Sequence, residues 1–295
     1  MNNMLQSQDS MWSEDIFDKY PPHLIDLGAK RTVALRDTAA EGPVVILVHG
    51  NSLSSRSFGF QFDSPLSRHY RLISLDLPGH GDSPRAADPE RDYTIKGYAD
   101  IIKRLVEKLN VPEVILGGNS LGGHIVVEAM ADLESVVGIT LWGTPLLCSP
   151  DSLEQGYIPP PSVSAFLKAR PSKEEVLALF QNIAEKSPAI RDILVDDFLR
   201  RTDERAREVL GNSVANGEFI DEVELISRRK IPVAIFHGTV DPFVSGSYIH
   251  SLMLPLLWRG CIQLFPTVGH YLQIEEPQLF NQRLDAFLKD MFWEQ

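Results

Sequence analysis

The strongest constraint on the fold of this chain is an alternation of short apolar runs with longer segments of helical period. Eight runs of three to five residues are rich in β-branched and aliphatic side chains, which is typical of strands. Strands that alternate with helices favour a mostly parallel sheet with helices on its faces. We therefore expect an α/β fold with strands at residues 23–27, 32–36, 44–48, 71–75, 114–116, 137–141, 233–236 and 262–265.

The helical pattern is clearest at residues 94–109. Apolar side chains recur there every three or four positions, and Thr94 is a residue type that commonly caps a helix. Pro112 ends the helical pattern, because proline lacks the amide hydrogen that a helix requires. We expect an amphipathic helix that packs against the sheet.

A chain of 295 residues can form two ordinary domains or one large domain with an insertion. The alternation breaks after the sixth predicted strand, where Tyr-Ile-Pro-Pro-Pro at 157–161 predicts an extended loop. Ser172 and Glu175 then have the spacing of a helix capping box. We expect a helical cap, or lid, at 146–227, a core at 21–145 and 228–295, and a tail at 1–20. The alternative is that these helices are a solvated decoration that covers no site.

Charge and composition exclude several classes of partner. The 28 basic and 40 acidic side chains leave a net charge of −12, which repels nucleic acid and anionic lipid surfaces. The sequence contains no apolar run of the roughly 18 to 20 residues that a membrane helix needs, and residues 1–19 lack the pattern of a secretory signal. Two cysteines, Cys148 and Cys261, favour a reduced compartment and hence the cytoplasm, although one disulfide remains possible.

The clearest chemical motif is Gly-Asn-Ser-Leu-Gly at residues 118–122, between the strand 114–116 and a helix expected at 121–133. A serine in this setting forms a nucleophile elbow, a sharp turn that exposes the hydroxyl group. Glycines flank the serine because a β-carbon there would collide with the neighbouring strand and helix. Ser120 is therefore the candidate nucleophile; the alternative is an ordinary strand-to-helix turn.

Residues 49–52, His-Gly-Asn-Ser, follow another strand and can complete an oxyanion hole. The backbone amides of Asn51 and Leu121 are the candidate donors to a developing oxyanion. We expect His49 to be a buried residue that stabilises this loop. The run 76–83, Asp-Leu-Pro-Gly-His-Gly-Asp-Ser, is expected to be a tight turn in which His80 and Asp82 bind backbone groups. No histidine cluster at ligand spacing joins them, so no metal and no other cofactor is expected.

The acid and the base must follow the serine if the chain has the residue order usual for this elbow. Asp241 follows the strand 233–236, and His270 follows the strand 262–265. The loop after the strand 137–141 contains no carboxylate at residues 141–145, which favours Asp241 as the acid. Four apolar residues beside these loops could line a substrate pocket or equally belong to the core: Trp142, Leu146, Phe243 and Tyr271.

With these motifs the chain resembles the α/β hydrolases, and among them most closely the metal-independent N-acyl-homoserine lactone lactonases. The similarity lies in residues 49–52, 75–83, 92–100, 120–125, 143–145 and 201–207. It implies the α/β-hydrolase fold, an eight-stranded sheet, a triad of Ser120, Asp241 and His270, and oxyanion donors at Asn51 and Leu121. The similar lactonases carry Glu where Asp241 stands and a bulkier residue at the position of Asn119.

The expected reaction is attack of Ser120 on the carbonyl of a small-molecule ester or lactone, with a covalent acyl-enzyme as intermediate. Three alternatives remain open at this point. The chain could be a general carboxylesterase, a hydrolase of carbon–carbon bonds in diketones, or a receptor that keeps a hydrolase pocket and signals through its lid. The sequence does not indicate the oligomeric state.

Overall fold

The computed structural model describes residues 16–158, 163–166 and 168–293, which form one sheet, two helical layers and a helical cap. The eight strands lie in the order β1-β2-β4-β3-β5-β6-β7-β8. Pairs β1–β2 and β2–β4 are antiparallel, and the other pairs are parallel, so the predicted mostly parallel, eight-stranded sheet is confirmed. The strands are β1 (His23–Asp26), β2 (Thr32–Asp37), β3 (Val44–Val48), β4 (Arg71–Leu75), β5 (Val114–Asn119), β6 (Val136–Trp142), β7 (Val233–Gly238) and β8 (Gln263–Phe265).

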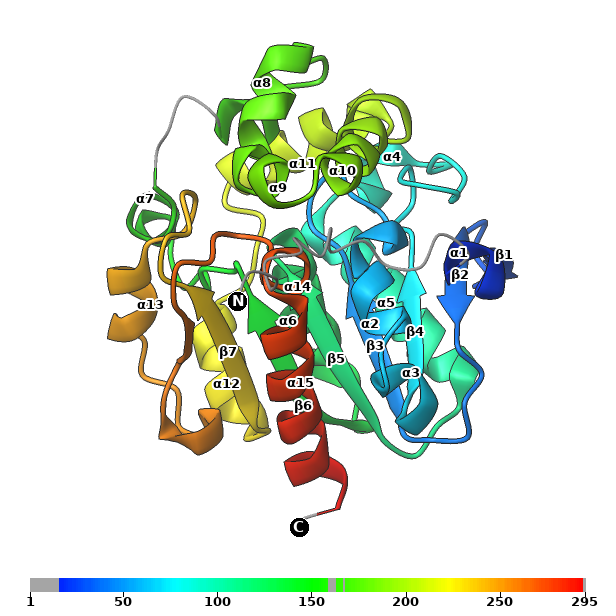
Figure 1. Ribbon diagram of the computed structural model, residues 1–295, viewed down its shortest axis with the longest axis vertical. Helices are drawn as coiled ribbons and strands as arrows, with labels where there is room; N and C mark the ends of the chain where they lie inside the picture. The colour runs from blue at the N-terminus through cyan, green and yellow to red at the C-terminus, as the bar shows by residue number, and fades with distance from the viewer. Residues whose placement is uncertain (1–15, 159–162, 167, 294–295) are drawn as a thin grey trace, which may run out of the picture.

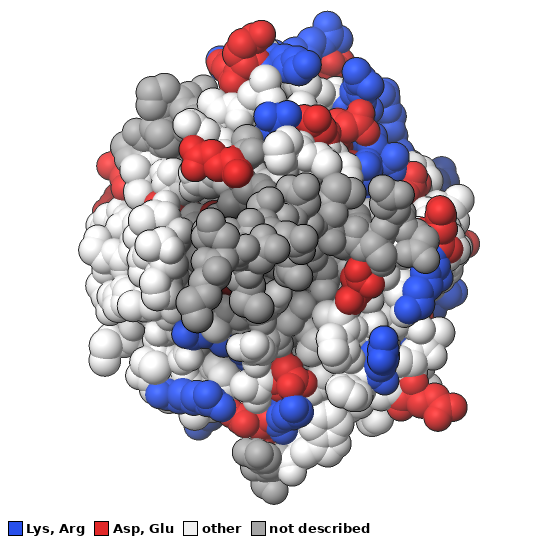
Figure 2. All heavy atoms as spheres, in the orientation of Figure 1, with Lys and Arg blue, Asp and Glu red and all other residues white. Residues whose placement is uncertain are grey.

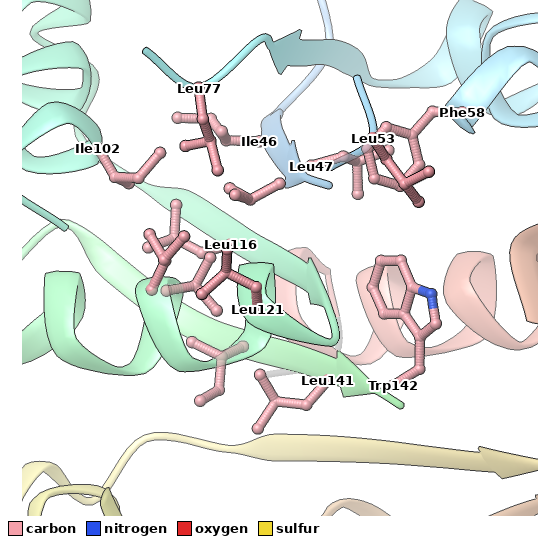
Figure 3. Packing of buried hydrophobic residues seen from close by; sticks show 14 of the residues in the cluster. Ile46, Leu47, Leu53, Phe58, Leu77, Ile102, Leu116, Leu121, Leu141 and Trp142 are labelled. Carbon is pink, nitrogen blue, oxygen red and sulfur yellow. The ribbon is translucent and has the colours of Figure 1, made fainter. Parts of the chain in front are cut away.

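The central strands are apolar because helices cover both faces of the sheet. Every residue of β3 and β5 is buried, as expected for parallel strands between two helical layers. Figure 3 shows Ile46 and Leu47 of β3 with Leu116 of β5 in the buried cluster. Strands with continuous apolar runs therefore occupy the centre of the sheet, and the exposed strand β1 lies at its edge.

Helices α5 (Ile95–Leu109), α6 (Leu121–Ala129) and α12 (Glu222–Arg229) pack side by side as one layer, and α2 (Gly59–Phe62), α3 (Leu66–His69) and α15 (Pro277–Phe292) form the other (Figure 1). The predicted cap of α5 is confirmed, since the Thr94 hydroxyl oxygen accepts a hydrogen bond from the Gly97 amide at 2.9 Å. Asn110 ends this helix in the left-handed conformation. The helix after the serine is shorter than predicted and continues as a 3-10 turn over Met130–Asp132.

Above the carboxyl ends of the parallel strands lie α8 (Lys173–Leu179), α9 (Gln181–Lys186), α10 (Pro188–Arg200) and α11 (Glu204–Ala215) (Figure 1). The predicted capping box of Ser172 and Glu175 starts α8. The predicted end of the cap at residue 227 is wrong, because α12 packs against α6 in the core layer. The short helix α7 (Asp151–Gly156) leads from β6 into the cap, and residues 159–161 of the predicted loop lie outside the described residues.

The described part of the predicted tail packs against the core. Helix α1 (Ile16–Lys19) buries Ile16, which is 1% exposed. The Arg36 guanidinium donates to the carbonyl oxygens of Tyr20 at 2.7 Å and Phe17 at 3.2 Å. Residues 16–20 are therefore part of the folded core, which corrects the predicted boundary at residue 21, while residues 1–15 lie outside the described residues.

Charged residues intermix on the cap surface. In Figure 2 the Lys and Arg side chains lie among Asp and Glu side chains over the cap helices, so the net charge of −12 forms no single acidic field there. None of the helices in the described part of the chain combines the length and apolarity that a membrane span requires. Cys148 and Cys261 are both free and exposed.

Candidate active site

Ser120 lies in the sharp turn between β5 and α6, with φ of 53° and ψ of −117°. A side chain in this left-handed region is strained and needs support from its surroundings. The close packing of the turn leaves no room for β-carbons at either flanking glycine. A β-carbon on Gly118 would lie 2.3 Å from the carbonyl carbon of Gly122, and one on Gly122 would lie 2.2 Å from the carbonyl oxygen of Val48. The Ser120 amide donates to the Trp142 carbonyl at 2.9 Å, and Ser120 is partly exposed.

His270 and Asp241 form a buried pair at the ends of β8 and β7. The Nδ1–H of His270 donates to Oδ2 of Asp241 at 2.8 Å, and the side chains are 3% and 0% exposed. The other carboxylate oxygen of Asp241 accepts the amides of Phe243 at 2.8 Å and Val244 at 3.1 Å. Because Asp241 is fixed and occupies Nδ1, Nε2 is the nitrogen of His270 that stays available for proton transfer.

Asn119 and Gly143 connect the serine turn with the histidine loop. The Asn119 side-chain amide donates to the carbonyl oxygens of Trp142 at 3.2 Å and His270 at 3.5 Å. A β-carbon on Gly143 would lie 2.8 Å from Cε1 of His270, so the backbone after β6 packs directly on the imidazole ring. The structure thus brings Ser120, His270 and Asp241, which are far apart in the sequence, to one end of the sheet.

Glu275 holds the histidine loop, a role that the sequence analysis did not identify. Its carboxylate accepts the amides of Gly269 at 2.8 Å and Tyr271 at 3.0 Å, the two residues that flank His270. The sequence signal for such a loop anchor is an acidic residue five positions after the candidate histidine. Asn119 was also missed, because its two acceptors, at the end of β6 and in the loop after β8, are far from it in the sequence.

The candidate oxyanion loop lies directly against the serine. A β-carbon on Gly50 would be 3.4 Å from Cβ of Ser120, so the turn that carries Asn51 contacts Ser120. Leu121 is the first residue of α6, and the first amides of a helix have no acceptor within the helix. The two predicted donors therefore border Ser120 from two elements.

His49 has the structural role that the sequence predicted. It is fully buried, its Nδ1–H donates to the Gly50 carbonyl at 2.8 Å, and its Nε2 accepts the Leu77 amide at 3.0 Å. Burial lowers the pKa of His49, which keeps the ring neutral. With both nitrogens engaged, this histidine anchors the loop.

The loop after β4 agrees with the prediction only in part. His80 contacts the backbone, since its Nδ1–H donates to the Pro78 carbonyl at 3.2 Å. The prediction for Asp82 is wrong, because its carboxylate accepts from the Arg201 guanidinium of the cap at 2.7 Å. Over the residues that the structure describes, no group of three or more His, Cys, Asp or Glu side chains could hold a metal ion.

Two of the four candidate pocket residues belong to the packed core. Trp142 is fully buried, with its ring edge-to-face against Phe280 at 4.9 Å and Phe58 at 6.2 Å. Figure 3 shows Trp142 at the end of β6, on the side of the sheet away from Leu121. Leu146 is also fully buried and belongs to the hydrophobic core cluster.

Phe243 and Tyr271, in contrast, flank the imidazole ring of His270. Each ring stands edge-to-face to His270 at a centroid distance of 5.0 Å. Phe243 also contacts Phe166 at 5.6 Å, and Tyr271 contacts Phe180 at 5.4 Å. These two phenylalanines come from the cap, which therefore closes over the histidine through aromatic contacts.

The chain is similar in sequence and in structure to known proteins. The model of a family described as Alpha/beta hydrolase family matches residues 45–283. The crystal structure of N-acyl homoserine lactonase AidH complexed with N-butanoyl homoserine is similar with a TM-score of 0.86 at 28% identity, over 92% of this chain and 97% of that chain. A 2-hydroxy-6-oxononadienedioate/2-hydroxy-6-oxononatrienedioate hydrolase of Paraburkholderia phymatum is 24% identical over 284 residues, which are 90% of this chain and 94% of that protein. An uncharacterized hydrolase, YugF, of Bacillus subtilis is 25% identical over 256 residues, 83% of this chain and 89% of that protein.

Proposed function

Because this chain belongs to the alpha/beta hydrolase family, as its motifs predict, we propose that it is a serine hydrolase in which Ser120 attacks the carbonyl carbon of an ester or lactone. The observation that carries the proposal is the buried His270–Asp241 hydrogen bond beside a serine in a strained, partly exposed turn. This arrangement provides a nucleophile, a base and a carboxylate that orients the base.

In the proposed mechanism, Nε2 of His270 accepts the Ser120 proton while the serine oxygen bonds to the carbonyl carbon. Asp241 fixes the tautomer through Nδ1 and stabilises the imidazolium that forms. The amides of Asn51 and Leu121 donate to the oxyanion of the tetrahedral intermediate. The leaving alcohol takes the proton from His270, and a water molecule activated by the same histidine then releases the acyl group from Ser120.

Hydrolysis of a lactone requires that water reach the acyl-enzyme before the ring closes again. The alcohol that leaves remains tethered to the acyl group, so the ring can close again unless water reaches the acyl-enzyme quickly. We propose an N-acyl-homoserine lactone as the substrate, supported by the 28% identity and TM-score of 0.86 with a lactonase over nearly the full length of both chains. The aromatic rings of Phe166 and Phe180 next to the His270 loop favour an apolar acyl chain under the cap. The two free cysteines are compatible with action in the cytoplasm.

The test combines turnover with mass spectrometry on the wild-type chain and Ser120→Ala. Incubation with an N-acyl-homoserine lactone should yield a product heavier than the lactone by one water molecule and a transient acyl adduct on Ser120. The alanine variant should keep its fold, form no adduct and turn over slower by on the order of 10⁴ to 10⁶. Turnover of Ser120→Ala at the wild-type rate would refute the serine mechanism.

A carbon–carbon bond hydrolase is the second candidate, supported by the relative from Paraburkholderia phymatum. A panel of acyl-homoserine lactones, p-nitrophenyl esters and vinylogous diketones separates the candidates by kcat/KM. Highest kcat/KM on the diketone would replace the lactonase proposal, and preference for simple esters would indicate a carboxylesterase. Tight binding of the lactone without repeated turnover would indicate a receptor instead.

A further inference from the structure

Arg207 of helix α11 is a buried cation that ties the cap to the loop beside Ser120. Its side chain is almost fully covered. The guanidinium donates to the carbonyl oxygens of Lys168 at 2.8 Å, Ala169 at 2.6 Å and Phe198 at 3.1 Å, and to Oγ of Ser52 at 3.2 Å. It also lies 4.9 Å from the centre of the Phe198 ring. Three acceptors belong to the cap, and the fourth belongs to the candidate oxyanion loop.

All four acceptors are neutral, which is unusual for a buried charge. Within the described part of the chain, no carboxylate lies within ion-pair distance of Arg207. Burial lowers the pKa of Arg207 to about 10, against the opposing effect of Glu204 and Asp203, so the side chain is still cationic at neutral pH. Burying a cation without a paired anion reduces stability. The reason for an arginine here therefore lies in the geometry of its donors, which only a planar guanidinium offers.

Ser52 connects Arg207 with Asn51 through two hydrogen bonds. The Ser52 hydroxyl accepts from Arg207 and donates to Oδ1 of Asn51 at 2.9 Å, while the Asn51 side-chain amide donates to the Phe166 carbonyl at 3.0 Å. Ser52 itself has φ of 61°, a conformation that a residue other than glycine adopts at a cost. The loop is therefore strained, and cap residues hold it from two directions.

We propose that Arg207 is a positioning residue that, through Ser52, holds the backbone amide of Asn51 in place to bind the oxyanion. This inference rests on the proposed serine hydrolase function. It means that the oxyanion hole is complete only while the cap is docked, because the cap supplies the Phe166 carbonyl that the Asn51 side chain binds and the Arg207 guanidinium that holds Ser52. Arg207 acts on the transition state through the loop and does not touch the substrate.

The test compares Ser52→Ala and Arg207→Met with Arg205→Met as a matched control. Arg205 lies on the same helix, but its side chain is exposed and pairs with Glu90 at the surface. Ser52→Ala leaves the three carbonyl contacts of Arg207 intact, so the cap stays anchored while the link to Asn51 is lost. We expect kcat on a p-nitrophenyl ester to fall about 10-fold in Ser52→Ala and about 10- to 100-fold in Arg207→Met. KM should change less than about 3-fold. The reason is that one oxyanion donor raises kcat by about 10² to 10³, and a misplaced donor loses part of this factor. Arg205→Met should match the wild type.

A pair of inhibitors isolates the oxyanion effect. An alkyl trifluoromethyl ketone adds to Ser120 and forms an oxyanion, whereas the matched alkyl amide binds without reacting. Ki for the trifluoromethyl ketone should rise in proportion to the loss of kcat/KM, and Ki for the amide should stay constant. The double variant should be no slower than Arg207→Met alone, since both changes break one chain of contacts.

The outcomes separate the inference from the proposed function. If the wild-type chain neither turns over an ester nor adds the trifluoromethyl ketone at Ser120, the serine hydrolase proposal fails. If the wild type does both, but Ser52→Ala keeps its kcat and its Ki for the trifluoromethyl ketone, the positioning role of Arg207 is wrong. Equal weakening of both inhibitors would also overturn it, because the effect would then be a general loss of the pocket.

Discussion

Two buried histidine–carboxylate pairs lie close to the serine turn, and they differ in what the second ring nitrogen contacts. His270 donates through Nδ1 to Asp241 at 2.8 Å, and His124 through Nδ1 to Glu222 at 2.9 Å. In each pair the two side chains are at most 3% exposed. Nε2 of His124 accepts from the Tyr157 hydroxyl at 2.9 Å. Within the described part of the chain, Nε2 of His270 forms no hydrogen bond, and the Phe243 and Tyr271 rings flank the imidazole, so this nitrogen is the one that we propose for proton transfer.

The second pair joins three elements of the fold. His124 comes from α6, Glu222 from α12, and Tyr157 from the segment that enters the cap. The other oxygen of Glu222 accepts the amide of Leu147, just after β6, at 2.6 Å. Every polar atom of this group has a partner, so its hydrogen bonds are used for stability. The comparison teaches that a buried histidine–carboxylate pair is suited to chemistry only where one nitrogen is left for a substrate or nucleophile.

The largest effect should come from removing the proposed base. We expect His270→Ala to lower kcat by a factor of at least about 10⁴, because Ser120 then has no proton acceptor. Asp241→Asn should lower kcat by a factor on the order of 10⁴, because asparagine does not hold His270 in the tautomer with the proton on Nδ1. His124→Ala should keep kcat within about 3-fold, since both ring nitrogens are already bonded, to Glu222 and to Tyr157. Steady-state kinetics on a p-nitrophenyl ester measures all three. Loss of turnover in His124→Ala without loss of fold would reverse the assignment of the two pairs.

The His124–Glu222 pair should contribute more to the free energy of unfolding than the His270–Asp241 pair. Glu222→Ala leaves the Leu147 amide and the His124 ring without their acceptor, and we expect a loss of about 3 kcal/mol in the free energy of unfolding. Glu222→Gln keeps an acceptor oxygen and should lose less than half of this. Urea unfolding followed by circular dichroism gives the values, and His270→Ala is the matched control at the other pair. Equal stability of Glu222→Ala and the wild type would contradict the structural role.

Asp197 of α10 is a third buried carboxylate, and it differs from Asp241 and Glu222 because its side-chain partners are a serine and arginines rather than a histidine. It accepts from the Ser54 hydroxyl at 2.5 Å and the Arg56 guanidinium at 2.9 Å, and Arg201 lies 3.3 Å away. Burial raises the pKa of Asp197 from 3.8 to about 6, while the two arginines and Ser54 act in the opposite direction. The folded chain therefore binds more protons than the unfolded chain between about pH 4 and pH 6.

A pH series on Asp197→Asn tests this linkage. Because the folded pKa is the higher one, the wild type should lose unfolding free energy as pH rises from about 3 to about 7, by about 3 kcal/mol in total relative to the variant, and the difference should be constant above about pH 7. Urea unfolding is measured for both chains at each pH. The titration of all other groups contributes equally to both and therefore cancels in the difference. A difference that does not change with pH would mean that Asp197 ionises normally.

The sequence predicted the strands of the sheet better than the contacts of the cap. Strands 44–48 and 71–75 have the predicted bounds, because both runs consist mainly of aliphatic residues that are buried between two helical layers. Ser120, Asp241 and His270 could be chosen because each follows a strand in a loop of recognisable composition. Asn119, Glu275 and Arg207 were missed as anchors, since their partners depend on how distant segments pack. The predicted cap boundary at 227 failed for the same reason, as α12 is helical in pattern but belongs to the core layer through α6.

The smallest predicted effect concerns the Tyr157 hydroxyl, which is bonded to Nε2 of His124 and has no counterpart at His270 in the described part of the chain. Tyr157→Phe removes the donor to Nε2 of His124 and should lower the free energy of unfolding by about 1 kcal/mol, the usual value of one buried hydrogen bond. Burial raises the pKa of Tyr157, so the wild-type phenol keeps its proton and the contact is present throughout the neutral range. Tyr20→Phe, at a partly exposed ring of the core, controls for loss of a phenol in general. Since freeing Nε2 of His124 creates no second base beside Ser120, kcat should stay within about 2-fold, and a new pH optimum in Tyr157→Phe would show that the two pairs are interchangeable after all.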